Sequence, residues 1–250
     1  TMPPRLSRHT GLTLALAVSV TLGGWLATPP TAHADAGAAP ALPAQWPGTI
    51  ALSVDATDLE RRIVRVQQTL PLDAAPAARR VALRFARYLP GGHGPYGDVT
   101  RLAGLVVRAG DQRLAWRRES DDPFTFWVEL PAGAAELQLA FQYLAPVRGS
   151  GERISISRAL LSLEWESLLL YPAGPAVQAL RIQPRLKLPP GWRQASALRA
   201  AGGKAPQPGA DGWVDFAPVS VETLVDSPLF AGRHLKQWAL DKPGAAQPVA

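Results

Sequence analysis

The sequence predicts an all-β protein, an antiparallel β-sandwich preceded by a helical signal peptide. Several runs of residues alternate between apolar and polar side chains with a period of two, which is the pattern of half-buried strands. Turn-forming residues separate these runs, and the 250 residues include 25 prolines and 22 glycines, a composition that disfavours a helical bundle. Hydrophobic residues make up 47% of the chain, which excludes a wholly disordered protein.

The first predicted element is an export signal over residues 1–34. Arg5 and Arg8 give it a basic start, and the apolar stretch 12–26 is short for a membrane span. Residues 32–34, Ala-His-Ala, fit the small-x-small cleavage rule, so we expect cleavage after Ala34. The mature protein is then expected in the bacterial periplasm or secreted, without contact with a membrane. The alternative is an uncleaved membrane anchor.

The mature chain is predicted to have three parts. Residues 35–46 are an Ala/Pro-rich, flexible lead-in, residues 47–243 form the β-sandwich, and residues 244–250 are a truncated tail. The absence of cysteine excludes disulfides and thiolate metal sites. The formal net charge of +6 comes from basic residues scattered among acids, so no nucleic-acid partner is predicted.

Four segments of the β-sandwich carry the clearest strand pattern, at residues 79–87, 124–130, 136–144 and 179–188. We expect two packed antiparallel sheets. Pro184 in the last segment predicts a bulge or an edge position, because proline cannot donate a hydrogen bond to a sheet. Residues 109–112, Ala-Gly-Asp-Gln, predict a hairpin turn. Residues 157–170 fit neither period, and a short helix is one interpretation of them.

Few motifs point to catalysis. The sequence has no H-E-x-x-H zinc motif, no phosphate-binding glycine loop and no G-x-S-x-G nucleophile elbow. Glu164 and Glu166 would share a face on a strand, as an acid pair for glycoside hydrolysis could. We favour the simpler interpretation of two solvated strand carboxylates. Asp121-Asp122-Pro123 is interpreted as a turn, and residues 200–212 as a polar surface loop without assigned chemistry.

The loop Leu89–Asp98, LPGGHGPYGD, is the strongest candidate for a site. Long Gly/Pro loops in compact domains are functional or disordered. His93, Tyr96 and Asp98 are its polar candidates for contact with a substrate cleft. The alternative is a loop that only holds its shape, with glycines that permit positive φ.

Longer stretches resemble a known family. Residues 88–146 contain an aromatic-x-Pro-Gly loop and a hairpin that ends in Leu-x-Trp, and LLLYPAG and LPPGW follow at 168–174 and 188–192. The most specific match is ETLVDSPLFAGRH at 222–234. These stretches are similar to the N-terminal domain of the glycyl-aminopeptidase family of exported zinc metallopeptidases, the sixty-first metallopeptidase family. The resemblance covers roughly residues 47–242.

The resemblance implies a domain that precedes a thermolysin-like catalytic domain with an H-E-x-x-H motif. Since that motif is not in this sequence, no catalytic, metal or cofactor residue is assigned, and zinc belongs to the complete family enzyme. We expect a noncatalytic β domain, a fragment or a truncated paralogue, that supports or shapes the cleft of a catalytic domain in cis or in trans. Peptides are further candidate partners. The alternative is a free-standing periplasmic module that binds peptides or proteins.

Overall fold

The computed structural model describes residues 46–147 and 153–238. They belong to one compact unit, Ala38–Ala250. The predicted signal peptide, its cleavage after Ala34, nearly all of the lead-in and the tail at 244–250 lie outside the described residues. Within the described part, no helix has the length and apolar character that crossing a membrane requires.

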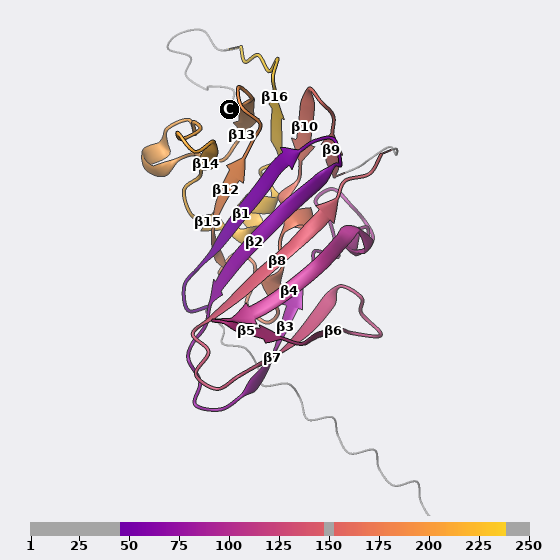
Figure 1. Cartoon of the computed structure of the whole chain (residues 1–250), viewed down its shortest axis with the longest axis vertical. Helices are drawn as coiled ribbons and strands as arrows, with labels where there is room; N and C mark the ends of the chain where they lie inside the picture. Colours follow the sequence, from indigo (N-terminus) through magenta and orange to yellow (C-terminus); the bar gives the residue numbers. More distant parts are fainter. Residues whose placement is uncertain (1–45, 148–152, 239–250) are drawn as a thin grey trace, which may run out of the picture. The chain divides into compact units, whose positions relative to one another are not determined.

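The largest sheet has eight strands and runs through the middle of the unit (Figure 1). Seven of the eight follow one another in hydrogen-bonded order, and the eighth, β15, pairs with β12 beside β14. The order is β14 (Trp213–Asp215), β12 (Arg181–Lys187), β1 (Thr49–Asp58), β2 (Ile63–Pro71), β8 (Glu136–Leu144), β4 (Leu102–Ala109) and β5 (Gln112–Leu114), with β15 at Val219–Ser220.

Two sheets of four strands complete the described fold. The first has the order β13 (Arg193–Ser196), β16 (Leu229–Gly232), β10 (Leu160–Leu163) and β9 (Ile154–Ile156). The second has the order β11 (Tyr171–Pro172), β3 (Arg79–Arg84), β7 (Thr125–Leu130) and β6 (Trp116–Arg118). The helical elements are short: η1 (Val99–Arg101), η2 (Trp165–Leu168), η3 (Ala201–Gly203) and α1 (Val221–Val225).

Side chains from all three sheets meet in one apolar core, which includes Val54 of β1, Phe126 of β7 and Leu163 of β10. The mostly-β prediction is therefore confirmed. The prediction of two antiparallel sheets is wrong in two respects, because the described residues form three sheets and β1 pairs with β12 in parallel. Alternation within a strand reports which face is buried, but it carries no information on the direction of a distant partner.

The predicted strands appear at their expected places. Residues 136–144 form β8, and β3, β7 and β12 begin and end within the other three segments. The hairpin turn at 109–112 joins β4 to β5, with Ala109 paired to Gln112 and Gly110 at φ 55°. Residues 157–170 contain strand β10 and the 3-10 helix η2 in place of one short helix.

Pro184 lies inside the large sheet, so the predicted bulge or edge position is wrong. It pairs with Leu52 in the unbroken parallel register of β1 and β12. On the other side of β12, β15 pairs with 181–182 and β14 with 185–187, which leaves a gap at the proline. Phe216 N–H donates to Pro184 O across this gap, at 3.1 Å. The proline is tolerated because its missing N–H falls where no strand needs a donor.

Candidate functional site

The loop Leu89–Asp98 connects β3 to η1, and the structure shows what its polar residues contact. The side chains of His93 and Tyr96 are exposed, the latter at 66%. Asp98 is half-buried and accepts hydrogen bonds from Thr100 Oγ1 and Arg101 Nε. Asp98 therefore holds the end of the loop, and its carboxylate is occupied by its own neighbours.

Glycines keep this loop close to the preceding segment. A Cβ on Gly97 would meet Ala86 O at 1.9 Å, and a Cβ on Gly94 would meet the Tyr96 ring at 2.9 Å. Gly97 N–H donates to Arg87 O at 3.1 Å. Close approach to the preceding segment thus explains Gly97, whereas the neighbour of Gly94 is an exposed side chain of the loop itself, and Gly91 has a positive φ of 71°. A role of His93, Tyr96 and Asp98 at a substrate cleft stays a prediction.

A buried ionic cluster surrounds η2, and it corrects the interpretation of Glu164 and Glu166 as solvated strand carboxylates. Glu164 precedes η2 and Glu166 lies within it, with only 1% of the Glu166 side chain exposed. Arg153 Nε donates to Glu166 Oε1 at 2.6 Å, and Arg153 Nη2 lies 2.5 Å from Glu164 Oε2. The turn of 3-10 helix carries Glu166 into the interior, and Arg153 contacts both carboxylates there.

Burial raises the pKa of Glu166 from its ordinary 4.5 to about 7. The hydrogen bond and charge of Arg153 oppose this rise, and the charge of Glu164 adds to it. Glu166 Oε2 is buried without a hydrogen-bond partner among the described residues. A carboxyl with such a pKa can exchange a proton near neutral pH, but this one is enclosed and bound to an arginine. The cluster therefore supports the fold and does not form an open acid pair.

Two long-range contacts hold the η2 segment in place. Gln68, at an interior position of β2, donates from Nε2 to Leu170 O at 3.1 Å and accepts from Leu170 N–H at 2.8 Å. Trp165 Nε1 donates to Ser227 O at 3.0 Å from a fully buried ring. These bonds fasten the segment to the large sheet and to the residues that precede β16.

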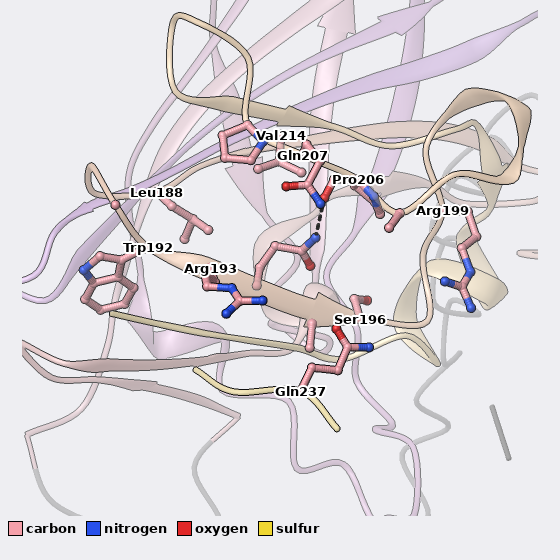
Figure 2. A pocket seen from close by; sticks show the side chains of 14 residues that line it. Leu188, Trp192, Arg193, Ser196, Arg199, Pro206, Gln207, Val214 and Gln237 are labelled. Atoms are coloured by element: carbon pink, nitrogen blue, oxygen red, sulfur yellow. Dashed lines mark hydrogen bonds between the residues drawn. The ribbon is translucent and has the colours of Figure 1, made fainter. Parts of the chain in front are cut away.

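A polar cavity of about 370 Å³ lies beside β13 (Figure 2). Its walls include β13 and the segment 205–208, and Gln194 Nε2 bridges them by donating to Pro206 O at 3.2 Å. Gln194 Oε1 and Trp192 Nε1 are buried without a hydrogen-bond partner among the described residues. Arg193 and Arg199 also line the cavity. The sequence does not predict this site, because residues 200–212 have the composition of a polar surface loop and β13 is only four residues long.

The sheet β13-β16-β10-β9 has one face in the core and one face outside it. Leu161 pairs with Ala231 on the buried face. On the other face, which we call the outer face, Leu160 is 50% and Phe230 is 49% exposed. The outer face is completed by small or polar side chains and one charge, at Ser155, Ser162, Arg193, Ala195 and Gly232. Leu160 and Phe230 make the outer face a candidate surface for a contact with another protein.

Among residues 46–147 and 153–238, no group of three His, Asp or Glu side chains is arranged to hold a metal ion. The described histidines, His93 and His234, are both exposed. These residues therefore do not fit the zinc that the family resemblance implies for the complete enzyme.

Comparison with known proteins gives both a family and a fold. The model of the Peptidase M61 N-terminal domain matches residues 51–233. A solved aminopeptidase N family protein from Idiomarina loihiensis is 19% identical, with a TM-score of 0.58 over 74% of this chain and 29% of that one. An M1 zinc metallopeptidase from Deinococcus radiodurans is 14% identical, with a TM-score of 0.46 over 77% of this chain and 43% of that one. No curated protein matches the chain.

The Idiomarina structure shares the fold of this chain, and at that identity the likeness extends no further. Our chain spans 29% of the length of that aminopeptidase. The fold described above is thus found as one part of the longer chain of an aminopeptidase N family protein.

Proposed function

Because this chain belongs to the Peptidase M61 N-terminal domain family, we propose that it is the noncatalytic β domain of a glycyl-aminopeptidase-like zinc metallopeptidase. It would support or shape the substrate cleft of a zinc peptidase domain that acts with it in cis or in trans. The observation that carries the proposal is the family match, which spans residues 51–233 and therefore nearly all strands of the three sheets. We assign no zinc chemistry to the described residues.

The outer face is the surface that we assign to the peptidase domain. Leu160 and Phe230 are half exposed there, and Arg193 is its one charged residue. Water contact with these apolar side chains is unfavourable, and a partner domain that covers them would remove it. The small residues Ser155, Ser162 and Ala195 around them allow close approach of a partner.

The loop Leu89–Asp98 is assigned to the rim of the cleft. Its exposed His93 and Tyr96 side chains are available to contact a substrate, and Asp98 fixes the loop through Thr100 and Arg101. The role assigned to Asp98 is positioning.

We also infer export to the periplasm or the medium through residues 1–34. Expression of the full chain in a bacterial host should give a mature protein that begins at Asp35, as measured by intact mass. A full-length mass in the membrane fraction would contradict this.

A two-polypeptide experiment tests the main proposal. The chain is mixed with the separately expressed catalytic domain of an M61 peptidase, and co-elution and hydrolysis of glycyl-p-nitroanilide are measured. We expect the chain alone to hydrolyse nothing and to bind the catalytic domain. Zinc-dependent hydrolysis by the chain alone would overturn the proposal.

Matched variants locate the contact. Leu160→Ser with Phe230→Ser removes the apolar side chains of the outer face, and we expect binding to weaken by about tenfold or more. Leu144→Ser with Val147→Ser removes two other exposed apolar side chains, which are 41% and 73% exposed, and serves as the control. Equal affinities of the two double variants would refute the assignment of the outer face.

A free-standing periplasmic module that binds peptides or proteins is the second candidate function. The polar cavity beside β13 favours it, because its buried hydrogen-bonding groups lack partners among the described residues. A strictly monomeric chain without affinity for any M61 catalytic domain would support this candidate over the first.

A further inference from the structure

The cavity beside β13 follows the open edge of a sheet. β13 ends its sheet and pairs with β16 alone among the described strands. All four residues of β13, Arg193–Ser196, line the cavity. Successive side chains on a strand point to opposite faces, so a cavity lined by four successive residues runs along the edge and not over one face. Figure 2 shows the strand crossing the cavity with the Arg193 guanidinium in it.

No described strand pairs with the backbone hydrogen-bonding groups on this edge. In an antiparallel pair, alternate residues exchange hydrogen bonds with the partner strand, and the residues between them direct N–H and C=O to the other side. The other wall, residues 205–208, has the sequence Ala-Pro-Gln-Pro, and no backbone bond joins it to β13 in the described part of the chain. Pro206 and Pro208 lack N–H groups, so this wall cannot pair with the edge as a strand would.

The side chains around this edge favour a ligand with negative charge. Arg193 and Arg199 line the cavity, no carboxylate is among its described lining residues, and neither arginine has an ion pair there. Gln194 Oε1 is a buried acceptor without a donor among the described residues. A peptide N–H can donate to this oxygen, whereas a simple anion supplies acceptors only.

We propose that the open edge of β13 and this cavity bind a short, extended peptide segment that carries an acidic side chain. The segment adds a strand to the sheet through backbone hydrogen bonds, and its carboxylate lies against Arg193 and Arg199. The cavity volume of about 370 Å³ is within the range of roughly 300–1,000 Å³ that is usual for ligand sites. The proposal names a ligand class for the second candidate function and does not depend on a contact with a peptidase domain, although Arg193 lies both in the cavity and on the outer face.

Calorimetric titration with three synthetic peptides tests the proposal. The first is an acetylated and amidated six-residue peptide of alternating valine and threonine with one aspartate. The second has asparagine in place of aspartate, and the third has N-methyl groups on alternate backbone nitrogens, which prevent strand pairing. We expect the first peptide to bind and each of the others to bind about tenfold more weakly or worse. No binding of the first peptide up to about 1 mM would overturn the proposal.

A fourth titration, with N-acetyl-aspartate amide, separates a peptide site from a simple carboxylate site. If it binds as tightly as the first peptide, strand addition is refuted. Variants then locate the site: Arg193→Gln with Arg199→Gln should remove the preference for aspartate over asparagine. The control, Arg113→Gln with Arg117→Gln, removes two exposed arginines from β5 and β6 and changes the net charge by the same amount. This variant should keep the preference for aspartate over asparagine. Equal behaviour of the two pairs, both shown to melt as the parent does, would overturn the proposed location.

Discussion

Replacement of Glu166 by glutamine should stabilise the protein above neutral pH and leave its stability in acid nearly unchanged. The wild-type side chain is 1% exposed, and burial raises its pKa from 4.5 to about 7. Between pH 4.5 and about pH 7, Glu166 keeps its proton in the folded state but has lost it in the unfolded state. The free energy of unfolding therefore falls as the pH rises through this window, and the loss is complete above about pH 7.

The size of the effect follows from the shift in pKa. Each pKa unit corresponds to about 1.4 kcal/mol, so a rise from 4.5 to about 7 costs the ionised wild type about 3 kcal/mol. Glutamine keeps the shape and an oxygen that accepts from Arg153 Nε, and Arg153 retains its contact with Glu164. The amide NH₂ takes the place of an oxygen that already lacked a partner. The main change is removal of a buried charge.

Urea unfolding followed by tryptophan fluorescence, in half-unit steps from about pH 4 to pH 8, measures the difference between variant and wild type. This difference should rise by up to about 3 kcal/mol across the window and then level off. Other groups that titrate contribute equally to both proteins and cancel in this difference in unfolding free energy. Asp58 is an example, since hydrogen bonds from Arg65 and Arg61 lower its pKa in both. Glu164→Gln, which touches the same arginine, is the control and should stay within about 1 kcal/mol of wild type. A difference that does not change with pH, or that falls as pH rises, would refute this account.

Two further predictions concern backbone groups. Gln68→Leu removes the hydrogen-bond partners of Leu170 N–H and C=O, which stay buried. We expect the free energy of unfolding to fall by roughly 2–4 kcal/mol in the same urea experiment. An unchanged midpoint would show that water replaces the amide. Gly97→Ala places a Cβ at 1.9 Å from Ala86 O and should cost more than about 2 kcal/mol, whereas Gly91→Ala meets no atom and should cost about 1 kcal/mol for its positive φ. Equal losses in these two glycine variants would contradict the close approach that we assign to Gly97.

Strands with a strict period of two could be predicted well from the sequence, and β8 matches its predicted bounds at residues 136–144. The same pattern occurs in β1, where Ile50, Leu52 and Val54 are buried, although it was not singled out. The partner of each strand could not be predicted, because the parallel register of β1 with β12 joins segments more than 100 residues apart. Short strands such as β13 have too few residues to show a period.

The candidate site was predicted less well, for a related reason. Burial of Glu166 depends on one turn of 3-10 helix and on Arg153, thirteen residues earlier, and neither follows from the local pattern around Glu164. The loop Leu89–Asp98 was found because glycine and proline are strong local signals, but the backbone approach that requires Gly97 is a tertiary feature. The local sequence therefore predicted which segments carry the candidate residues. The burial and hydrogen bonding of these residues depend on contacts between segments that are distant in the sequence.

The most family-like stretch, residues 222–234, builds the part of the fold to which both proposed contacts belong. It begins within α1 and continues through β16, the strand between β13 and β10. Ser227 O accepts from Trp165 Nε1 at 3.0 Å and from Ser196 Oγ at 3.3 Å, and so joins the η2 segment to the end of β13. Ser227 Oγ in turn donates to Thr223 O of α1 at 2.7 Å. The stretch that resembles the family's signature thus connects, through Ser227, the sheet that carries the outer face and the open edge of β13 with the segment of the buried cluster at η2.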